Sequence, residues 1–170
     1  MEFQLKSSER KAVFEEIANY LDGLNLKVIS NDFTRPWGGF FVIDESQAKQ
    51  FAELFFLGVD LSSLRISGKL SPKILVVEPK KRLSWQYHFR RAEIWRAVSG
   101  KVGVVTSMTD EEKDTTHLKP GDEIRLAQGQ RHRLMGLNEW GVVAEIWQHT
   151  DAQNPSDESD IVRLQDDFGR

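Results

Sequence analysis

The stretch that decides the fold reads Gln86-Tyr-His-Phe-Arg-Arg-Ala-Glu-Ile-Trp-Arg-Ala-Val-Ser-Gly100. Its pattern predicts two short strands joined by a tight turn. Side chains two apart on a strand point to the same face, so Gln86, His88 and Arg90 are expected to share one face. Glu93 follows just past the turn. Four polar groups that converge in this way predict a functional site.

Short strands separated by turn residues dominate the sequence after Pro72. Glycine and proline turns such as Ser99-Gly100-Lys101 and Pro120-Gly121-Asp122 lie between them. Several short strands at this spacing are typical of an all-β sandwich or barrel rather than of alternating β and α units. The predicted strands are 74–77, 83–89, 94–98, 102–106, 123–126 and 142–147.

Two stretches before these strands have the apolar spacing of amphipathic helices, 8–24 and 46–57. Ser7 or Ser8 is expected to cap the first helix, and Ser46 the second. Strands are expected at 26–30 and 40–43, with a loop at 31–34 after the first.

We expect a single domain. The second helix and the loop after it are expected to pack on the barrel, although a lid or an oligomer contact stays open. The predicted divisions are a helix and lead-in at 1–34, the second helix and its loop at 46–72, the core barrel at 73–150, and an acidic loop with a C-terminal segment at 151–170.

Composition excludes several classes of function. A net charge of −3 and a pI near 5.8 give no overall attraction to nucleic acid or to anionic membranes. There are no cysteines, so disulfides and thiolate metal sites are excluded. Neither a signal peptide nor a long apolar run is visible, so a cytoplasmic location is the default expectation. Local basic groups such as Arg131 and Arg133 could still meet a small anion.

A second polar cluster is Gly129-Gln130-Arg131-His132-Arg133. The turn before it could bring His132 to the interior of the same barrel as His88 and Glu93. Two imidazoles and a carboxylate suit Zn²⁺, Fe²⁺ or Mn²⁺. The alternative is that each histidine is an ordinary hydrogen-bonded residue, which is the commoner role of a lone histidine on a strand.

Other notable residues are expected to have structural roles. The five tryptophans are expected in the core rather than as a platform for a sugar ring. No motif surrounds His117 or His149, so both are expected at the surface. Glu145 lies on the last predicted strand and is assigned no role.

Residues 79–100 and 120–134 together resemble the two conserved motifs of the cupin superfamily. More narrowly, the chain is similar to the type II mannose-6-phosphate isomerase domain, in the stretches 35–38, 86–95 and 160–170. The last is the most specific, because no general barrel needs that string. The resemblance implies a double-stranded β-helix, the cupin jelly-roll barrel.

The chain departs from the family pattern in two ways. Between Trp37 and Gln86 it is longer than the resemblance requires, which implies that 46–72 is an insertion. The other departure is at Arg90. The family motif usually reads His-x-His-Arg-x-Glu, and Arg90 replaces its second histidine. An arginine stays cationic and cannot ligate a metal. The resemblance therefore implies a divalent metal on His88, Glu93 and His132, with Gln86 as a further ligand. Arg90 would hold a phosphate or replace the charge of the metal.

The resemblance implies interconversion of mannose 6-phosphate and fructose 6-phosphate, or of a related sugar phosphate, for activated-sugar or polysaccharide synthesis. Glu93, His132 and Arg90 are the implied catalytic residues, although another carboxylate could be the base. Arg90, Arg163 and Arg170 are the implied substrate ligands, although Arg170 could equally anchor the tail through Asp166 or Asp167.

Two other functions stay open on the same fold, because a fold does not fix a function. One is a non-catalytic cupin that binds a sugar or a sugar nucleotide. The other is a metal-independent sugar-nucleotide epimerase, with His88 or His132 as its base. Cupins often pair through strand edges, so a homodimer is expected in each case.

Overall fold

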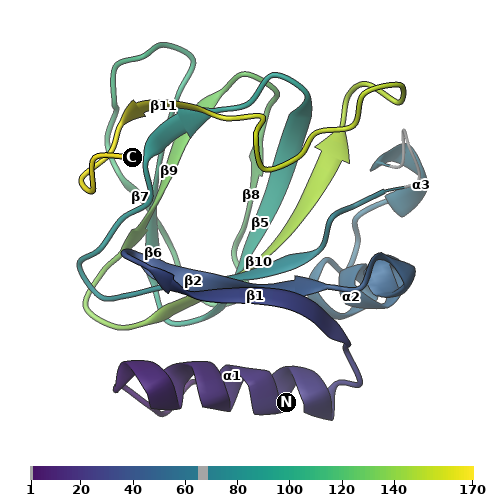
Figure 1. Cartoon of the computed structure of the whole chain (residues 1–170), viewed down its shortest axis with the longest axis vertical. Coiled ribbons are helices and arrows are strands. Elements are labelled where there is room, and N and C mark those ends of the chain that lie inside the picture. The colour runs from purple at the N-terminus through teal and green to yellow at the C-terminus, as the bar shows by residue number, and fades with distance from the viewer. Residues whose placement is uncertain (1, 65–68) are drawn as a thin grey trace.

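Antiparallel strands build most of this protein, whose computed structural model describes residues 2–64 and 69–170 (Figure 1). The strands are β1 (Val28–Arg35), β2 (Gly38–Ile43), β3 (Lys73–Val77), β4 (Trp85–Tyr87), β5 (Arg91–Ser99), β6 (Val102–Ser107), β7 (Thr116–Leu118), β8 (Glu123–Leu126), β9 (Arg131–Gly136), β10 (Gly141–His149) and β11 (Val162–Gln165). The helices are α1 (Arg10–Gly23), a 3₁₀ turn at Glu45–Gln47, α2 (Ala48–Phe55) and α3 (Leu61–Leu64).

The strands form two sheets. One has six strands in the order β1-β2-β3-β10-β5-β8, and the other has five in the order β11-β4-β9-β6-β7. Within each sheet, every pair of neighbouring strands is antiparallel. Neighbours far apart in sequence, such as β3 beside β10, are typical of a double-sheet jelly roll. The predicted all-β barrel is confirmed.

Alternation along β3, β5 and β10 divides the apolar side chains between two cores. Leu75, Val77 and Val143 face the interior between the sheets, where they pack with residues of β6 and β9. Their chain neighbours Ile74 and Val76 face outward into a second core. Because these central strands are buried on both faces, the residues between inward positions are apolar rather than polar.

The second core lies under the helices. Figure 1 shows α1 running along the outer side of β1 and β2. Its Phe14 stacks on Phe33 with ring centroids 4.4 Å apart and meets Trp140 edge-on at 6.0 Å. The buried face of α2, with Phe51 and Phe55, joins the same core. The helix of the predicted insertion is therefore a packing element.

The ends of several elements differ from prediction. Glu9, not a serine, caps α1 by accepting hydrogen bonds from the backbone N–H groups of Lys11 and Ala12. Asp44, not Ser46, caps the next helical turn. The loop expected at 31–34 belongs to β1, because pairing with β2 supplies backbone partners to residues whose polar side chains face solvent.

Three strands were not predicted, namely β7, β9 and β11. Each is short or rich in charged residues, so its sequence lacks the apolar alternation that marks a strand. No helix among the described residues is both long and apolar enough to cross a membrane.

Candidate metal centre

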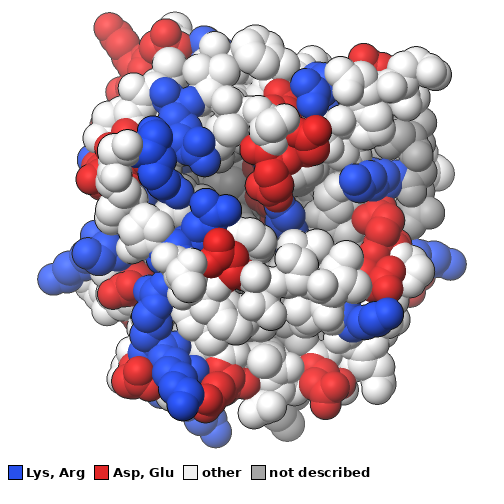
Figure 2. Space-filling model, viewed as in Figure 1, with Lys and Arg blue, Asp and Glu red and all other residues white. Residues whose placement is uncertain are grey.

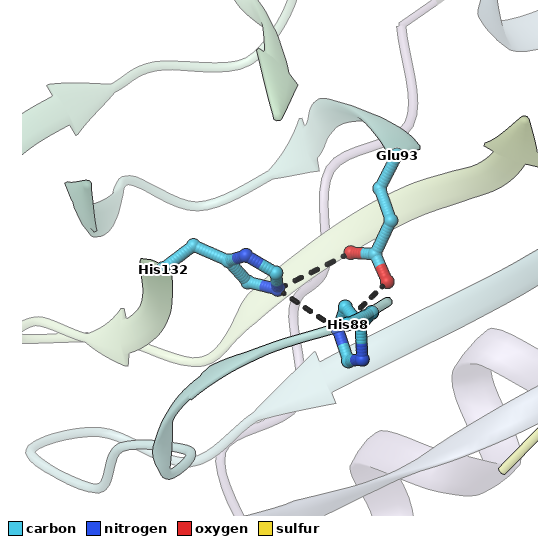
Figure 3. Close-up of side chains that lie close together, drawn as sticks. All are labelled: His88, Glu93 and His132. Atoms are coloured by element: carbon cyan, nitrogen blue, oxygen red, sulfur yellow. Dashed lines mark hydrogen bonds and ion pairs between the residues drawn. The ribbon is translucent and has the colours of Figure 1, made fainter. Parts of the chain in front are cut away.

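Two histidines and a glutamate meet inside the barrel. His88 follows β4, Glu93 lies on β5 and His132 lies on β9, and each is 2% exposed. Nε2 of His88 lies 3.2 Å from Nε2 of His132 and 3.2 Å from Oε1 of Glu93. Nε2 of His132 lies 3.5 Å from Oε2 of Glu93. Figure 3 shows the three side chains pointing toward one another from separate segments.

Strand register explains why these residues meet. Gln86 pairs with His132 across β4 and β9, which brings the end of β4 beside the second polar cluster. On β5, Glu93 shares its face with Trp95, which points into the inner core. The two sheets thus contribute to one site, as the sequence predicted for His88, Glu93 and His132.

Backbone carbonyls fix which nitrogen of each histidine carries hydrogen. Nδ1 of His88 lies 2.7 Å from the carbonyl oxygen of Asp160, and Nδ1 of His132 lies 3.0 Å from that of Gln130. A carbonyl oxygen can only accept, so Nδ1 is the donor in both rings. Both Nε2 atoms therefore present lone pairs toward Glu93, which is the arrangement of metal-ligating histidines.

Burial controls the charges of this cluster. It lowers the pKa of His88 to about 4 and also lowers the pKa of His132, so both rings are neutral near pH 7. Burial alone would raise the pKa of Glu93, but its neighbours His88 and Arg91 hold that pKa well below the usual range. The cluster thus has two neutral imidazoles and one ionised carboxylate, the protonation states that metal binding requires.

These residues fit a divalent metal. Oε2 of Glu93 is buried and has no hydrogen-bond partner among the described residues, so a carboxylate oxygen is left to accept a further ligand. Metal–ligand bonds of about 2.1 Å hold neighbouring donor atoms roughly 3.0–3.4 Å apart, close to the observed separations. Two histidines and one carboxylate suit Zn²⁺, Fe²⁺ or Mn²⁺, which would supply Lewis-acid charge.

An arginine that the sequence interpretation passed over lies beside the cluster. Arg91 donates from Nε to Oε1 of Glu93 at 2.8 Å, and its NH2 lies 3.3 Å from Nε2 of His88. The guanidinium stacks 3.6 Å from the ring centroid of Trp147. The signal was present, because Arg91 and Glu93 are two apart and so share one face of β5.

The prediction that Arg90 shares a strand face with Gln86 and His88 was wrong. β4 ends at Tyr87, and the chain bends at Phe89 and Arg90, so the alternation assumed from Gln86 to Arg90 stops early. The guanidinium of Arg90 instead lies 3.8 Å from Oδ1 of Asp157. The structure does not bring Arg90 to the histidines.

A small cavity adjoins the cluster, with a volume of about 90 Å³. Gln86 lines it beside Glu93, but its Oε1 accepts a hydrogen bond from Ser84 Oγ at 2.5 Å. Gln86 is thus near the predicted metal site with its oxygen already engaged. The remaining lining residues include Trp37, Phe40, Lys73, Arg91, Trp95, Glu145, Trp147, Glu158 and Ile161.

Three arginines also line this cavity, Arg35, Arg163 and Arg170. Arg35 pairs with Asp32 at 3.0 Å. Arg163, by contrast, forms no side-chain hydrogen bond or ion pair with any residue that the structure describes, and burial together with nearby Arg170 lowers its pKa. Figure 2 shows a hollow with basic side chains gathered on one side of it and acidic side chains on another. Arg163 is exposed, so its guanidinium is accessible from solvent, and arginines are common ligands of anionic groups in proteins.

Arg170 forms a salt bridge within the C-terminal segment, one of the two roles that the sequence left open. It pairs with Asp166, with 2.8 Å between Nε and Oδ2. Its predicted contact with substrate stays a prediction.

The C-terminal segment, yellow in Figure 1, closes the site by hydrogen bonds. The Asp160 carboxylate accepts the backbone N–H groups of Phe89 and Arg90 at 2.9 and 3.0 Å and the hydroxyl of Ser156. Ser156 Oγ also accepts from Arg91 at 2.9 Å. Sequence reasoning marked this string as specific but could not assign it this role, because the contacts bridge distant residues.

Two expectations for basic residues change. His149 is fully buried, so its predicted surface position was wrong: Nδ1 accepts the Ser156 N–H at 2.9 Å, and Nε2 lies 3.1 Å from Ser71 Oγ. Arg133 is also fully buried and donates to the Leu83 carbonyl and to Glu112, so it is not available to an anion.

Two further expectations, on the exposure of one histidine and the burial of the tryptophans, agree with the structure. His117 is exposed. All five tryptophans are buried as predicted, Trp37, Trp85, Trp95, Trp140 and Trp147.

The chain matches one protein-family model, described as mannose-6-phosphate isomerase C-terminal, over residues 57–166. This range contains 86–95, 120–134 and most of the C-terminal string, whereas 35–38 lies outside it. A search of curated proteins found no match.

Solved structures with similar folds are distant in sequence. A point mutant of Bacillus subtilis oxalate decarboxylase has a TM-score of 0.55 at 15% identity, covering 79% of this chain and 30% of that chain. A recombinant oxalate oxidase in complex with glycolate has a TM-score of 0.46 at 16% identity, covering 56% and 46%. A conserved double-stranded β-helix protein from Klebsiella pneumoniae has a TM-score of 0.43 at 20% identity, covering 49% and 70%.

At these identities the likeness is one of fold alone, and the chain spans less than half the length of several of the structures it matches. The family match covers well over half of the chain and includes all three residues of the candidate metal centre. The chain therefore belongs to the mannose-6-phosphate isomerase C-terminal family, and its two sheets form the double-stranded β-helix of a cupin.

Proposed function

We propose that this protein is a sugar-phosphate isomerase that interconverts mannose 6-phosphate and fructose 6-phosphate or a related pair. One observation carries the proposal: a His-Glu-His cluster suited to a divalent metal and a group of arginines line or adjoin the same cavity. Aldose–ketose isomerisation needs a positive charge for the enediolate oxygen and cations for the phosphate. The family description agrees with this reaction.

The position of each residue in the cavity assigns it a role in the proposed reaction. His88, Glu93 and His132 would hold the metal, which supplies Lewis-acid charge when bound. Arg91 places a fixed positive charge beside them. Arg163, unpaired among the described residues, is the first choice for the phosphate, with Arg35 and Arg170 as neighbours.

The cavity is too small to admit a sugar phosphate as it stands. A volume of about 90 Å³ is well below the roughly 300 Å³ at which ligand pockets usually begin. We therefore propose that a sugar phosphate enters when the C-terminal segment 156–170 moves outward, since Ile161, Arg163 and Arg170 of this segment line the cavity.

The test combines metal analysis with turnover on a panel of sugar phosphates. The purified protein is expected to hold Zn²⁺, Fe²⁺ or Mn²⁺ stoichiometrically and to lose it in His132→Ala, while His117→Ala, which alters an exposed histidine, retains it. Metal-free protein with no turnover of any sugar phosphate would sink the proposal.

A second variant pair tests the phosphate site. Arg163→Gln is expected to raise KM for the sugar phosphate about 10- to 100-fold, the effect of losing one charge-assisted contact. Arg125→Gln alters an exposed arginine of β8 and is the matched control. An unchanged KM in Arg163→Gln would exclude this residue from the phosphate site.

A second candidate function rests on Arg91. Its guanidinium already lies against Nε2 of His88 and Oε1 of Glu93, so it neutralises the carboxylate without a metal. This contact favours a metal-free cupin that binds a sugar phosphate without converting it. Calorimetric binding of mannose 6-phosphate to metal-free protein, with no turnover, would support this candidate. The homodimer and the cytoplasmic location stay predictions for both.

A further inference from the structure

A buried glutamate that the metal cluster does not use lies in the same cavity. Glu145 is on β10 and is 5% exposed. Both of its oxygens accept indole hydrogens: Oε2 from Trp95 Nε1 at 2.8 Å, and Oε1 from Trp147 Nε1 at 2.9 Å. These two indoles hold the carboxylate in one orientation at the cavity wall.

Glu145 differs from the other carboxylates that line the cavity. Glu93 is paired with Arg91 and belongs to the metal cluster. Glu158 is largely exposed and is paired with Lys73. Among the residues that the structure describes, Glu145 forms no ion pair. Among the lining carboxylates that the structure describes, it is therefore the buried one that forms no ion pair, although the charges of Lys73 and Arg91 still act on it.

Electrostatics separate the two buried glutamates further. Burial and the charge of Glu93 raise the pKa of Glu145 to about 8, against the lowering effects of Lys73, Arg91 and the Trp95 hydrogen bond, whereas the pKa of Glu93 is lowered. Two carboxylates whose surroundings push their pKa values apart are typical of a site in which one exchanges protons and the other stays charged.

We propose that Glu145 is the catalytic residue that moves the proton between C1 and C2 of the sugar phosphate, an inference that rests on the proposed isomerase function. In the aldose-to-ketose direction, the carboxylate takes the proton from C2. The electron pair of the C2–H bond forms the C1–C2 double bond, and the carbonyl oxygen at C1 takes up the charge. The hydroxyl proton on O2 then moves to O1, and Glu145 returns its proton to C1.

The experiment compares wild type with Glu145→Gln, which retains the shape of the side chain and removes the base. In D₂O, Glu145→Gln is expected to lower both kcat and deuterium incorporation into the sugar about 10²- to 10⁴-fold, with metal content and KM unchanged. Glu123→Gln makes the same substitution at an exposed position of β8 and is expected to behave as wild type.

Glu145→Asp is the second variant, because it retains the carboxylate and is expected to recover part of the exchange. Wild-type exchange in folded Glu145→Gln would overturn the inference, and so would a loss of bound metal that accounts for the lost activity. If Glu145→Gln does not fold, full wild-type exchange in Glu145→Asp overturns the inference, and reduced exchange supports it. A wild type without turnover on any sugar phosphate refutes the proposed function instead, and this inference with it.

Discussion

At the scale of single residues, the candidate site depends on groups that orient the metal ligands. Asp160 does so twice: its carbonyl fixes the tautomer of His88, and its carboxylate holds the backbone N–H groups of Phe89 and Arg90. The carboxylate thus fixes the bend that carries His88 to its place. Such outer contacts usually govern metal affinity almost as strongly as the ligands themselves.

Asp160→Ala is therefore expected to weaken binding of Zn²⁺ about 10- to 100-fold, although it alters no ligand. The binding would weaken because the bend at 89–90 loosens and the His88 ring becomes mobile. Competition with a chelator of known affinity measures the effect. Asp114→Ala alters an exposed aspartate and serves as the control. Equal affinities in the two variants would contradict the positioning role of Asp160.

At the scale of elements, close backbone approach decides which positions are restricted. Gly136 ends β9, and its N–H donates to the carbonyl of Lys81 at 2.8 Å. A Cβ at this position would lie 2.0 Å from the carbonyl oxygen of Glu78. The end of β9 and the loop after β3 therefore fit together only with glycine.

Gly136→Ala is expected to reduce the free energy of unfolding by about 2–3 kcal/mol, because the methyl group forces two backbone segments apart. Gly23→Ala is the matched control, since a Cβ at the end of α1 meets no atom within 4 Å. That variant is expected to be neutral or slightly stabilised. Urea denaturation of both variants measures the difference, and equal midpoints would refute the prediction.

Local patterns predicted the elements better than their contacts. Apolar spacing was enough for α1, α2 and most strands, and the residues at 88, 93 and 132 could be identified by their chemistry. The bend after β4 could not be predicted, because it depends on Asp160, some 70 residues later in the chain. Arg91 was missed for the same reason. Continued alternation from Gln86 would point Arg90 toward the histidines, but the strand ends at Tyr87 and Arg91 contacts them instead.

The hydrogen bonds from two tryptophans to Glu145 could not be predicted from the sequence either. Trp95 and Trp147 were correctly predicted to be buried, but burial says nothing of where an indole N–H points. Their convergence on one carboxylate depends on the register of β5 and β10, in which Glu145 lies opposite Trp95. A single sequence does not contain that register.

At the scale of the whole molecule, one buried histidine links acidity to stability. His149 is neutral in the folded protein, because its Nδ1 accepts the Ser156 N–H, and burial lowers its pKa to about 4. Nearby Lys69 and Arg91 lower this pKa further, and Asp160 partly offsets them. In the unfolded chain a histidine titrates near pH 6.5, so the unfolded state takes up a proton first as pH falls.

Metal-free protein is therefore expected to lose about 1–3 kcal/mol of stability through His149 as pH falls from about 6.5 to about 4, and to be insensitive to this group above that window. In His149→Asn, which removes the titrating ring, the fall across the same window should be smaller. Chemical denaturation at several pH values checks this. Parallel pH profiles for the two proteins would contradict it.

The hydrogen bond from His88 to Asp160 also has a consequence for the speed of folding. It joins residues 72 positions apart, the same separation as Lys73 and Glu145, which pair between β3 and β10 in the larger sheet. The contact that orients His88 and the pairing that builds this sheet therefore have similar loop-closure entropies. A fold that depends on contacts between residues so far apart in the chain is expected to form slowly.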